Sequence, residues 1–191
     1  MFNKFIAAAA LLLGGWVGAQ AAPSISVTPS LNTVTVGQNF VLNIDISGIT
    51  DLYGWQLDLD FGPAGLVNAT AVTEGSFLGL GTIFGPGTIN NGAAAISTLF
   101  SALTGASGVT GGGVLASVSF MAVAIGTATV SVLNVQLSDS NLDPIFFNFP
   151  GDALSATVSV VPEPASLALL SLGLACISLG LRRSARAARA R

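Results

Sequence analysis

Short runs in which apolar and polar residues alternate dominate the middle of the chain, and they constrain the fold more than any other feature. The clearest run is Tyr53–Phe61, in which nearly every second side chain is large and apolar. A period of two places those side chains on one face of a β-strand. Similar runs occur at Phe40–Ile46, Val114–Ala124 and Leu154–Val160, with Gly- and Pro-containing turns between the runs. This pattern predicts an all-β sandwich or barrel.

Two segments depart from simple alternation. In Thr127–Leu137 the apolar phase changes after Val132, which predicts a β-bulge with Leu133, Val135 and Leu137 on the new inward face. Residues 76–113 are rich in Gly, Ala and Ser, and we expect them to form a long excursion between strands.

Charged residues are strictly partitioned along the chain. Lys4 and five arginines near the C-terminus are the only cations, so residues 5–181 contain none, and the sequence has no His. The middle of the chain instead carries eight acids: Asp45, Asp51, Asp58, Asp60, Glu74, Asp139, Asp143 and Asp152. Binding of nucleic acid requires Lys or Arg to replace counterions, so a nucleic-acid partner is excluded.

The N-terminus has the order of a secretory signal peptide. A short segment with Lys4 precedes the apolar run Phe5–Val17, and Ala19 and Ala21 supply the small residues that signal peptidase requires. We expect residues 1–21 to be removed by cleavage before Ala22. The alternative is an uncleaved N-terminal anchor helix.

The C-terminus, residues 161–191, also has three parts. The motif segment 161–166 begins with Val161, Pro162, Glu163 and Pro164, and the stretch 167–181 is apolar or small throughout. Residues 182–191 then carry Arg182, Arg183, Arg186, Arg189 and Arg191. Because positive residues stay on the cytoplasmic side, a membrane helix over 167–181 would leave the domain outside.

This end resembles the PEP-CTERM sorting signal of Gram-negative bacteria. The resemblance implies recognition by an exosortase, cleavage near the motif, and delivery to the cell surface or to an exopolysaccharide matrix. A plain C-terminal anchor is the alternative. The single Cys, Cys176, lies in the apolar stretch, so the domain has no disulfide.

The domain, residues 22–160, is similar to a cohesin-type domain. The similarity rests on Val34–Gly37, Phe40–Ile46, Leu52–Phe61, Gly113–Phe120 and Ile125–Ala128. It implies a jelly-roll β-sandwich, related in fold to some carbohydrate-binding modules, and a fold alone does not specify a ligand.

Few residues qualify as a chemical site. Asp139, Asn141 and Asp143 have the spacing of oxygen ligands at the start of a calcium loop, but Pro144 stands where an EF-hand needs Gly. A looser Ca²⁺ site that includes Asp152 competes with an ordinary turn. Asp58 and Asp60 share one strand face, as a glycosidase pair could. The domain has no His, Lys or Arg to tune them, so an acidic outer strand face that limits edge aggregation is the preferred interpretation.

Other sequence features favour packing over chemistry. Tyr53 and Trp55 could stack on a sugar, but their phase indicates the core. Phe146, Phe147 and Phe149 could form a partly exposed patch, or a strand edge that covers the core. No catalytic residue is assigned, because no base exists in the domain to activate a Ser, and no cofactor is expected apart from Ca²⁺.

Two functions remain open at this stage. The first is a structural or adhesive surface protein associated with exopolysaccharide. The alternative is a binding module for carbohydrate or for a dockerin-type protein. In both, signal peptidase, exosortase and, before processing, the membrane are partners.

Overall fold

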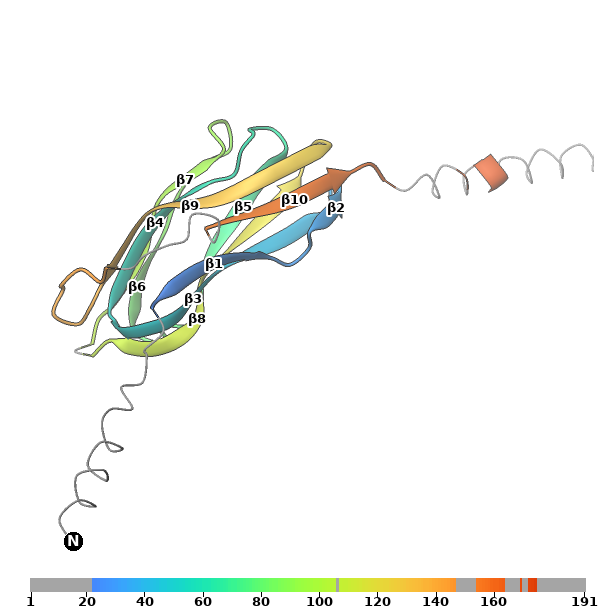
Figure 1. Cartoon of the computed structure of the whole chain (residues 1–191). Helices are drawn as coiled ribbons and strands as arrows, with labels where there is room; N and C mark the ends of the chain where they lie inside the picture. Colours follow the sequence, from blue (N-terminus) through green and yellow to red (C-terminus); the bar gives the residue numbers. More distant parts are fainter. Residues whose placement is uncertain (1–21, 106, 147–153, 164–168, 170–171, 175–191) are drawn as a thin grey trace, which may run out of the picture.

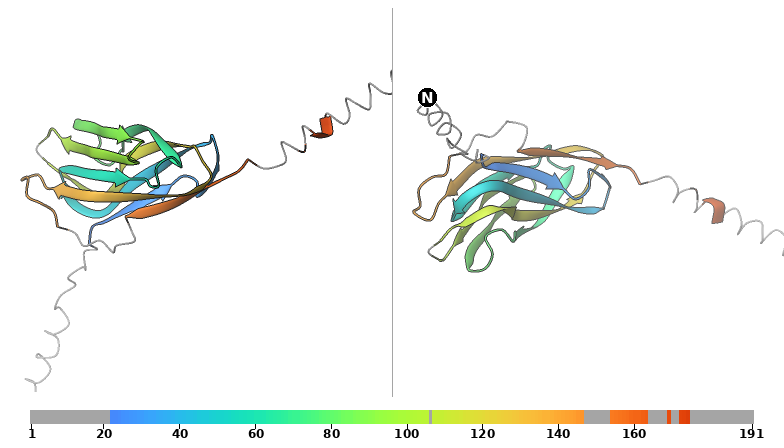
Figure 2. Two further views of the ribbon diagram at one scale, coloured as in Figure 1. Left: turned by 90° about the horizontal axis from the view of Figure 1, so that it is seen from above. Right: turned by 60° about the horizontal axis from the view of Figure 1, so that its bottom comes forward.

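The chain folds into a sandwich of two β-sheets (Figures 1 and 2). A computed structural model describes residues 22–105, 107–146, 154–163, 169 and 172–174. In chain order the strands are β1 (Ser24–Pro29), β2 (Thr33–Thr35), β3 (Asn39–Leu52), β4 (Gly54–Asp60), β5 (Val67–Glu74), β6 (Thr82–Asn90), β7 (Ala95–Leu103), β8 (Val109–Ala122), β9 (Gly126–Ser138) and β10 (Ser155–Val161). The predicted all-β sandwich is confirmed.

The sheets differ in size. The four-stranded sheet has the order β1-β3-β8-β5, and the six-stranded sheet has the order β2-β10-β9-β4-β7-β6. Most neighbours are antiparallel, whereas β2 runs parallel to β10. The chain passes from one sheet to the other between β3 and β4, just after Asp51, which lies near the end of β3 and has a φ of 57°. The predicted run Tyr53–Phe61 therefore begins at a sheet crossing.

The core lies between the sheets and consists of the side chains that the alternation placed inward. Trp55, Leu57 and Leu59 are buried, whereas Tyr53 at the crossing is only half-buried. Phe120 of β8 stacks on Phe40, with ring centroids 5.4 Å apart, and meets the edge of Phe61. Aromatic pairs of this geometry add to the free energy that burial alone provides.

The prediction of a long excursion over residues 76–113 is wrong. Strands β6 and β7 form an antiparallel hairpin there and complete the six-stranded sheet. The pattern was hidden because few inward positions are large, and because Ser97 and Thr98 are consecutively exposed between buried Ile96 and Leu99. Pro86 is tolerated because β6 is an edge strand.

The bulge expected in β9 is present. Gln56 of β4 pairs with Gln136 and Asp58 pairs with Leu133, so β9 has one extra residue, and Asn134 has a φ of 51°. The new inward phase begins at Val135 rather than at Leu133, whose side chain is 47% exposed. The prediction that Leu133 faces inward is therefore wrong, because the bulge turns its side chain toward solvent.

A second bulge lies directly across β4. Between the β4 partners Leu57 and Leu59, strand β7 has an extra residue, and Thr98 there has a φ of 59°. Asp58 lies between the two bulges. One of its carboxylate oxygens accepts the backbone N–H of Thr98 and the other accepts the Asn134 side-chain amide, each at 2.7 Å.

Hydrogen bonds to a carboxylate are stronger than neutral ones. They offset the cost of holding Thr98 and Asn134 in the left-handed region, which is of the order of 1 kcal/mol each. Asp58 thus stabilises the central part of the sheet.

The N-terminal and C-terminal segments leave the sandwich at opposite ends. Strands β1 and β10 run in the same direction, so Ala22 lies at one end of the sandwich and Val161 at the other (Figure 1). We call these the distal end and the proximal end. The expected cleavage residues Ala19 and Ala21, and the arginines from Arg182 onward, lie outside the described residues.

Replacement of Asp58 by Ala should lower the free energy of unfolding by about 1 kcal/mol, after allowance for its partial exposure to solvent. Asp60→Ala is the matched control, because Asp60 lies on the same strand and its carboxylate accepts a single hydrogen bond within the described ranges, from the Gly62 N–H. Urea unfolding of both variants measures the difference. Equal losses for the two would contradict the role of Asp58.

Candidate functional site

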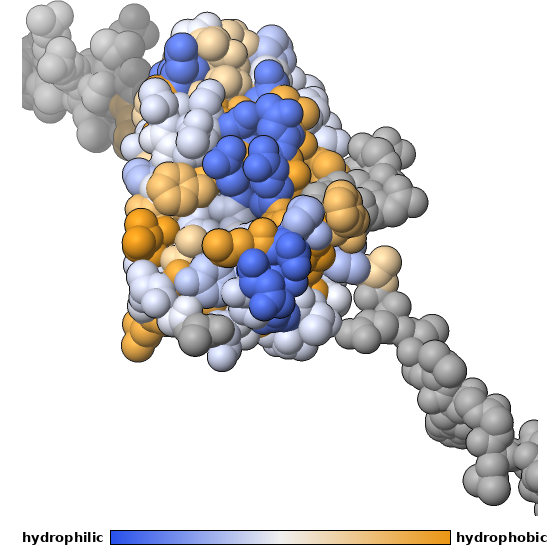
Figure 3. Space-filling view, turned by 90° about the vertical axis from the view of Figure 1, so that its left-hand side faces the viewer, coloured by the Kyte–Doolittle hydropathy of each residue, from blue (hydrophilic) through white to orange (hydrophobic). Residues whose placement is uncertain are grey.

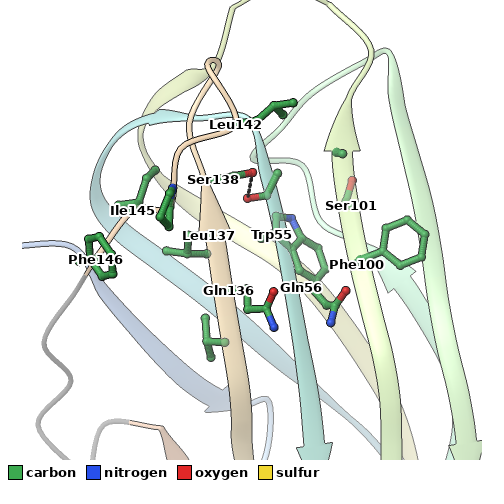
Figure 4. Close-up of a pocket in the computed structure, with 14 residues that line it drawn as sticks. Trp55, Gln56, Phe100, Ser101, Gln136, Leu137, Ser138, Leu142, Ile145 and Phe146 are labelled. Atoms are coloured by element: carbon green, nitrogen blue, oxygen red, sulfur yellow. Dashed lines mark hydrogen bonds between the residues drawn. The ribbon is translucent and has the colours of Figure 1, made fainter.

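A groove of about 590 Å³ lies on the outer face of the six-stranded sheet, toward the distal end (Figure 4). The cross-strand register defines its floor. Ser138, Gly54 and Ala102 form one row across β9, β4 and β7. Gln136, Gln56 and Phe100 form the next row in the same order. The floor therefore combines small side chains with two amides.

Small residues explain why this face is hollow. A β-carbon at Gly54 would lie 3.1 Å from the Ser138 hydroxyl and 3.4 Å from the Ala102 β-carbon. On one side the floor rises at Phe100, whose ring covers the backbone of Gly85 on the edge strand β6. A β-carbon at Gly85 would overlap Cε1 of that ring. Only Gly at this position lets Phe100 lie flat across the edge.

The opposite wall comes from the segment that follows β9. Ser138 forms a β-bridge with Pro144, and the Ile145 N–H donates to the Leu137 carbonyl at 2.9 Å. These bonds fold the chain back beside β9. Leu142 and Phe146 project from this wall with 71% and 87% of their surface exposed. The wall is therefore apolar and accessible.

Asp51 holds this wall against the rest of the distal end. One carboxylate oxygen accepts the Ser140 hydroxyl at 2.7 Å and the Ser140 N–H at 3.3 Å. The other accepts the Gly108 N–H at 3.0 Å, and the Asp51 N–H donates to the Thr110 hydroxyl. One acid at the sheet crossing thus connects the segments before β8 and after β9.

The hydrogen bonds around the two acids also lower their pKa values. The Ser140 hydroxyl is the largest cause for Asp51, and the N–H groups of Ser140 and Gly108 add to it against some desolvation. For Asp58 the Asn134 amide is the largest cause of a lowered pKa, followed by the Thr98 N–H. Donors that favour the charged form lower the pKa of a carboxyl group.

The residues of the predicted calcium site form a turn in this wall. One Asp139 carboxylate oxygen accepts the N–H groups of Asn141 and Asp143 at 2.8 and 2.9 Å. Within the described ranges no group of three His, Cys, Asp or Glu side chains is arranged to hold a metal. Asp152 lies outside those ranges, so the calcium site stays a prediction, and the contacts shown are those of a turn.

Other residues singled out in the sequence have packing roles. Asp58 and Asp60 serve as acceptors for nearby donors. Trp55 is buried, and its indole N–H has no hydrogen-bond partner among the described residues. Phe146 is the one exposed aromatic side chain in the described part of the chain, and Phe147 and Phe149 lie outside it.

Sequence reasoning missed Gln56, Gln136 and Ala102. Their polar or small character was visible, but only the strand register brings them together.

The distal end has a mixed surface. In Figure 3, which faces this end, hydrophilic residues form two groups, and hydrophobic residues lie between and beside them. Such a mixture of an apolar centre with polar neighbours is typical of protein-binding surfaces.

At the proximal end, β10 leads directly into the Pro-Glu-Pro motif. Val160 is buried, Val161 ends the strand, and Pro162 and Glu163 follow, whereas Pro164 lies outside the described residues. Residues 169 and 172–174 are helical. Where the structure is described, it contains no helix that is both long and apolar enough to span a membrane.

Comparison with family models decides the classification. Residues 25–145 match the model of the cohesin domain. The chain belongs to the cohesin domain family. Residues 160–184 match the PEP-CTERM protein-sorting motif, so this cohesin domain precedes a sorting motif of exported proteins. No curated protein matches the chain.

Solved cohesin structures share the fold at low sequence identity. A type II cohesin from a cohesin–X-dockerin complex of Acetivibrio cellulolyticus has 18% identity and a TM-score of 0.57, covering 73% of this chain and 95% of its own. A non-cellulosomal cohesin of Archaeoglobus fulgidus has 14% identity and a TM-score of 0.59, covering 76% and 96%. A cohesin module of a Clostridium perfringens family 33 glycoside hydrolase has 12% identity and a TM-score of 0.57, covering 73% and 98%.

The lowered pKa values of Asp51 and Asp58 predict how stability depends on pH. In both cases the folded-state pKa lies below the unfolded value of about 3.9, so the unfolded chain binds more protons as the pH falls. The stabilisation is complete above that value and is lost as the pH falls through the folded-state pKa values.

Urea unfolding of wild type and the Asp51→Asn/Asp58→Asn double variant, measured between neutral pH and pH 2, tests this. The wild type should lose more stability than the double variant below about pH 4. Parallel pH profiles would show that the two acids do not cause the dependence.

Proposed function

We propose that the chain is an exported, non-catalytic binding module that captures a protein partner in the groove of the six-stranded sheet. The observation that carries the proposal is the groove itself: a floor of small residues and amides beside an exposed apolar wall formed by Leu142 and Phe146. Apolar anchors surrounded by hydrogen-bonding groups are characteristic of protein interfaces.

The same surface favours protein over polysaccharide. Binding of a sugar chain by a flat sheet relies on several exposed aromatic rings, whereas this groove has one exposed ring, Phe146, and one half-buried ring, Phe100. Trp55, which could have stacked on a sugar, is buried. The cohesin from Acetivibrio cellulolyticus was solved in a complex with an X-dockerin, which is a protein partner. We therefore prefer the protein-binding alternative to a purely structural role in exopolysaccharide.

The charge of the domain restricts the partner. Residues 5–181 contain no Lys or Arg, and Asp51, Asp139 and Asp143 lie at the distal end near the groove. The field of these acids attracts a cationic partner and repels an anionic one. We expect the surface that fits the groove to be neutral or basic around an apolar centre.

Catalysis has no support at this site. The two best-placed acids, Asp51 and Asp58, have lowered pKa values, whereas a general acid at neutral pH needs a raised one. The groove floor offers amide and hydroxyl groups without a base to activate them. Binding is therefore the role that the site residues fit.

Delivery would follow the two terminal segments. Signal peptidase removes residues 1–21, and an exosortase recognises Val161-Pro162-Glu163-Pro164 while the apolar stretch holds the precursor in the inner membrane. Cleavage then places the domain on the cell surface or in the extracellular matrix of a Gram-negative bacterium. The match to the sorting motif supports this route.

Arginine at the groove floor should weaken capture of the partner. Ala102→Arg and Gln136→Arg fill the groove and repel a basic partner, and each should weaken binding at least about tenfold. Ser26→Arg on the exposed outer face of the other sheet adds the same charge and should leave the affinity within about twofold.

The probe for this test is the set of exported proteins of the producing bacterium. Proteins retained by the immobilised full chain are identified and purified, and their affinity for the three variants is measured by calorimetry. Equal affinity for all three variants would show that the partner does not bind in the groove. Retention of purified exopolysaccharide with no protein partner would favour the adhesive role instead.

The mass of the mature protein tests the delivery route. Protein recovered from the cell surface or medium should lack residues 1–21 and everything after a cut near Pro162–Pro164. In a strain without its exosortase the chain should keep its C-terminal arginines and remain in the membrane fraction. A mature product that still ends at Arg191 would contradict the route.

A further inference from the structure

The sorting motif begins inside the folded domain. The match starts at residue 160, and Val160 is buried in β10, where it pairs with Gly126 of β9 and Val34 of β2. No linker therefore separates the sandwich from the motif. Residues 162–166 are all that lie between the end of β10 and the apolar stretch that starts at Leu167.

This spacing limits how far the tethered domain can stand from the membrane. Five residues span at most about 18 Å even when fully extended. The proximal end of the sandwich is therefore held within about two Debye lengths of the lipid surface while the apolar stretch is in the membrane. This step depends on the membrane tether of the proposed function and is independent of the groove.

The proximal loops contain no charged residue. They are residues 36–38, 61–66, 91–94 and 123–125. The nearest charges along the chain are Asp60, whose carboxylate accepts the Gly62 N–H, and Glu163. By contrast, Asp51, Glu74, Asp139 and Asp143 lie in or beside distal loops. Asp60 and Glu163 are the two acids near the proximal end, against four at the distal end, so an anionic membrane would repel the distal end more strongly and turn the proximal end toward itself.

One proximal turn is both apolar and exposed. Ile125, between β8 and β9, has 60% of its surface exposed, and Val123 has 39%. The turn is held in place because the N–H groups of Val123 and Ala124 both donate to the Leu66 carbonyl. Figure 1 shows it at the end where the chain leaves the sandwich, far from the loop after β9.

We propose that the turn Val123–Ile125 rests on the lipid surface while the precursor is tethered. Exposed apolar side chains without neighbouring charge enter the headgroup region of a bilayer. Two such side chains would bind weakly to a vesicle on their own. The tether makes the contact intramolecular, so its high effective concentration keeps a weak contact occupied. The contact holds the distal groove away from the membrane.

Lipid-borne quenchers test this contact in the chain from Ala22 onward, because an uncleaved signal peptide at the distal end would itself enter the vesicle. Cys176→Ser removes the native thiol, and a fluorophore is attached at Ile125→Cys or, as the matched control, at Leu80→Cys. Leu80 is 99% exposed in the distal loop between β5 and β6. Both chains are reconstituted in vesicles of phosphatidylethanolamine and phosphatidylglycerol that contain spin-labelled lipids, and circular dichroism verifies that each is folded.

We expect the label at residue 125 to be quenched at least about twofold more strongly than the label at residue 80. Equal quenching in chains that float with the vesicles would overturn the lipid contact alone, and would leave the turn free for a protein such as the processing enzyme. Chains that do not float would overturn the tether and the contact together. Loss of groove binding would leave this result unaffected.

Discussion

Carboxylates without cations are the constraint on which this sandwich depends. Because no Lys or Arg is available in the domain, every acid that the fold draws inward must be satisfied by hydroxyl and N–H donors. Asp58 accepts donors from both flanking bulges, and Asp51 accepts donors from two segments at the sheet crossing. Glu74 accepts the Thr82 and Ser101 hydroxyls at 2.8 and 2.5 Å and so connects the two sheets.

Some strands could be predicted from the alternation of apolar and polar residues, and others could not, partly because carboxylates hold the bulges that interrupt it. The strand around Trp55, Leu57 and Leu59 was predictable because its inward side chains are large and uninterrupted. The β6–β7 hairpin was not, because the bulge at Thr98 shifts the phase and small residues carry the pattern. A bulge held by a residue 40 positions away has no local signal, since Thr98 depends on Asp58.

The groove shows the same division between local and long-range information. The turn at Asp139–Asp143 stood out in the sequence because its oxygen-bearing residues are clustered, but the cluster serves the backbone of the turn. The amides of Gln56 and Gln136 were invisible as a pair because they lie 80 positions apart and meet only through the β4–β9 register. Membership of the cohesin family and the sorting motif, by contrast, were predictable because contiguous motifs carry both.

The position of β10 has a mechanical consequence. This strand lies between β9 and β2, and the chain continues from its end toward the tail along the strand direction (Figure 2). The ladder hydrogen bonds between β10 and β9 are perpendicular to that direction. A pull between a partner bound in the groove and the residues that directly follow β10 would therefore load these bonds in shear, all together, rather than peel them apart one after another. A domain attached through a strand that is loaded in shear resists tension better than one whose last strand is peeled away one hydrogen bond at a time.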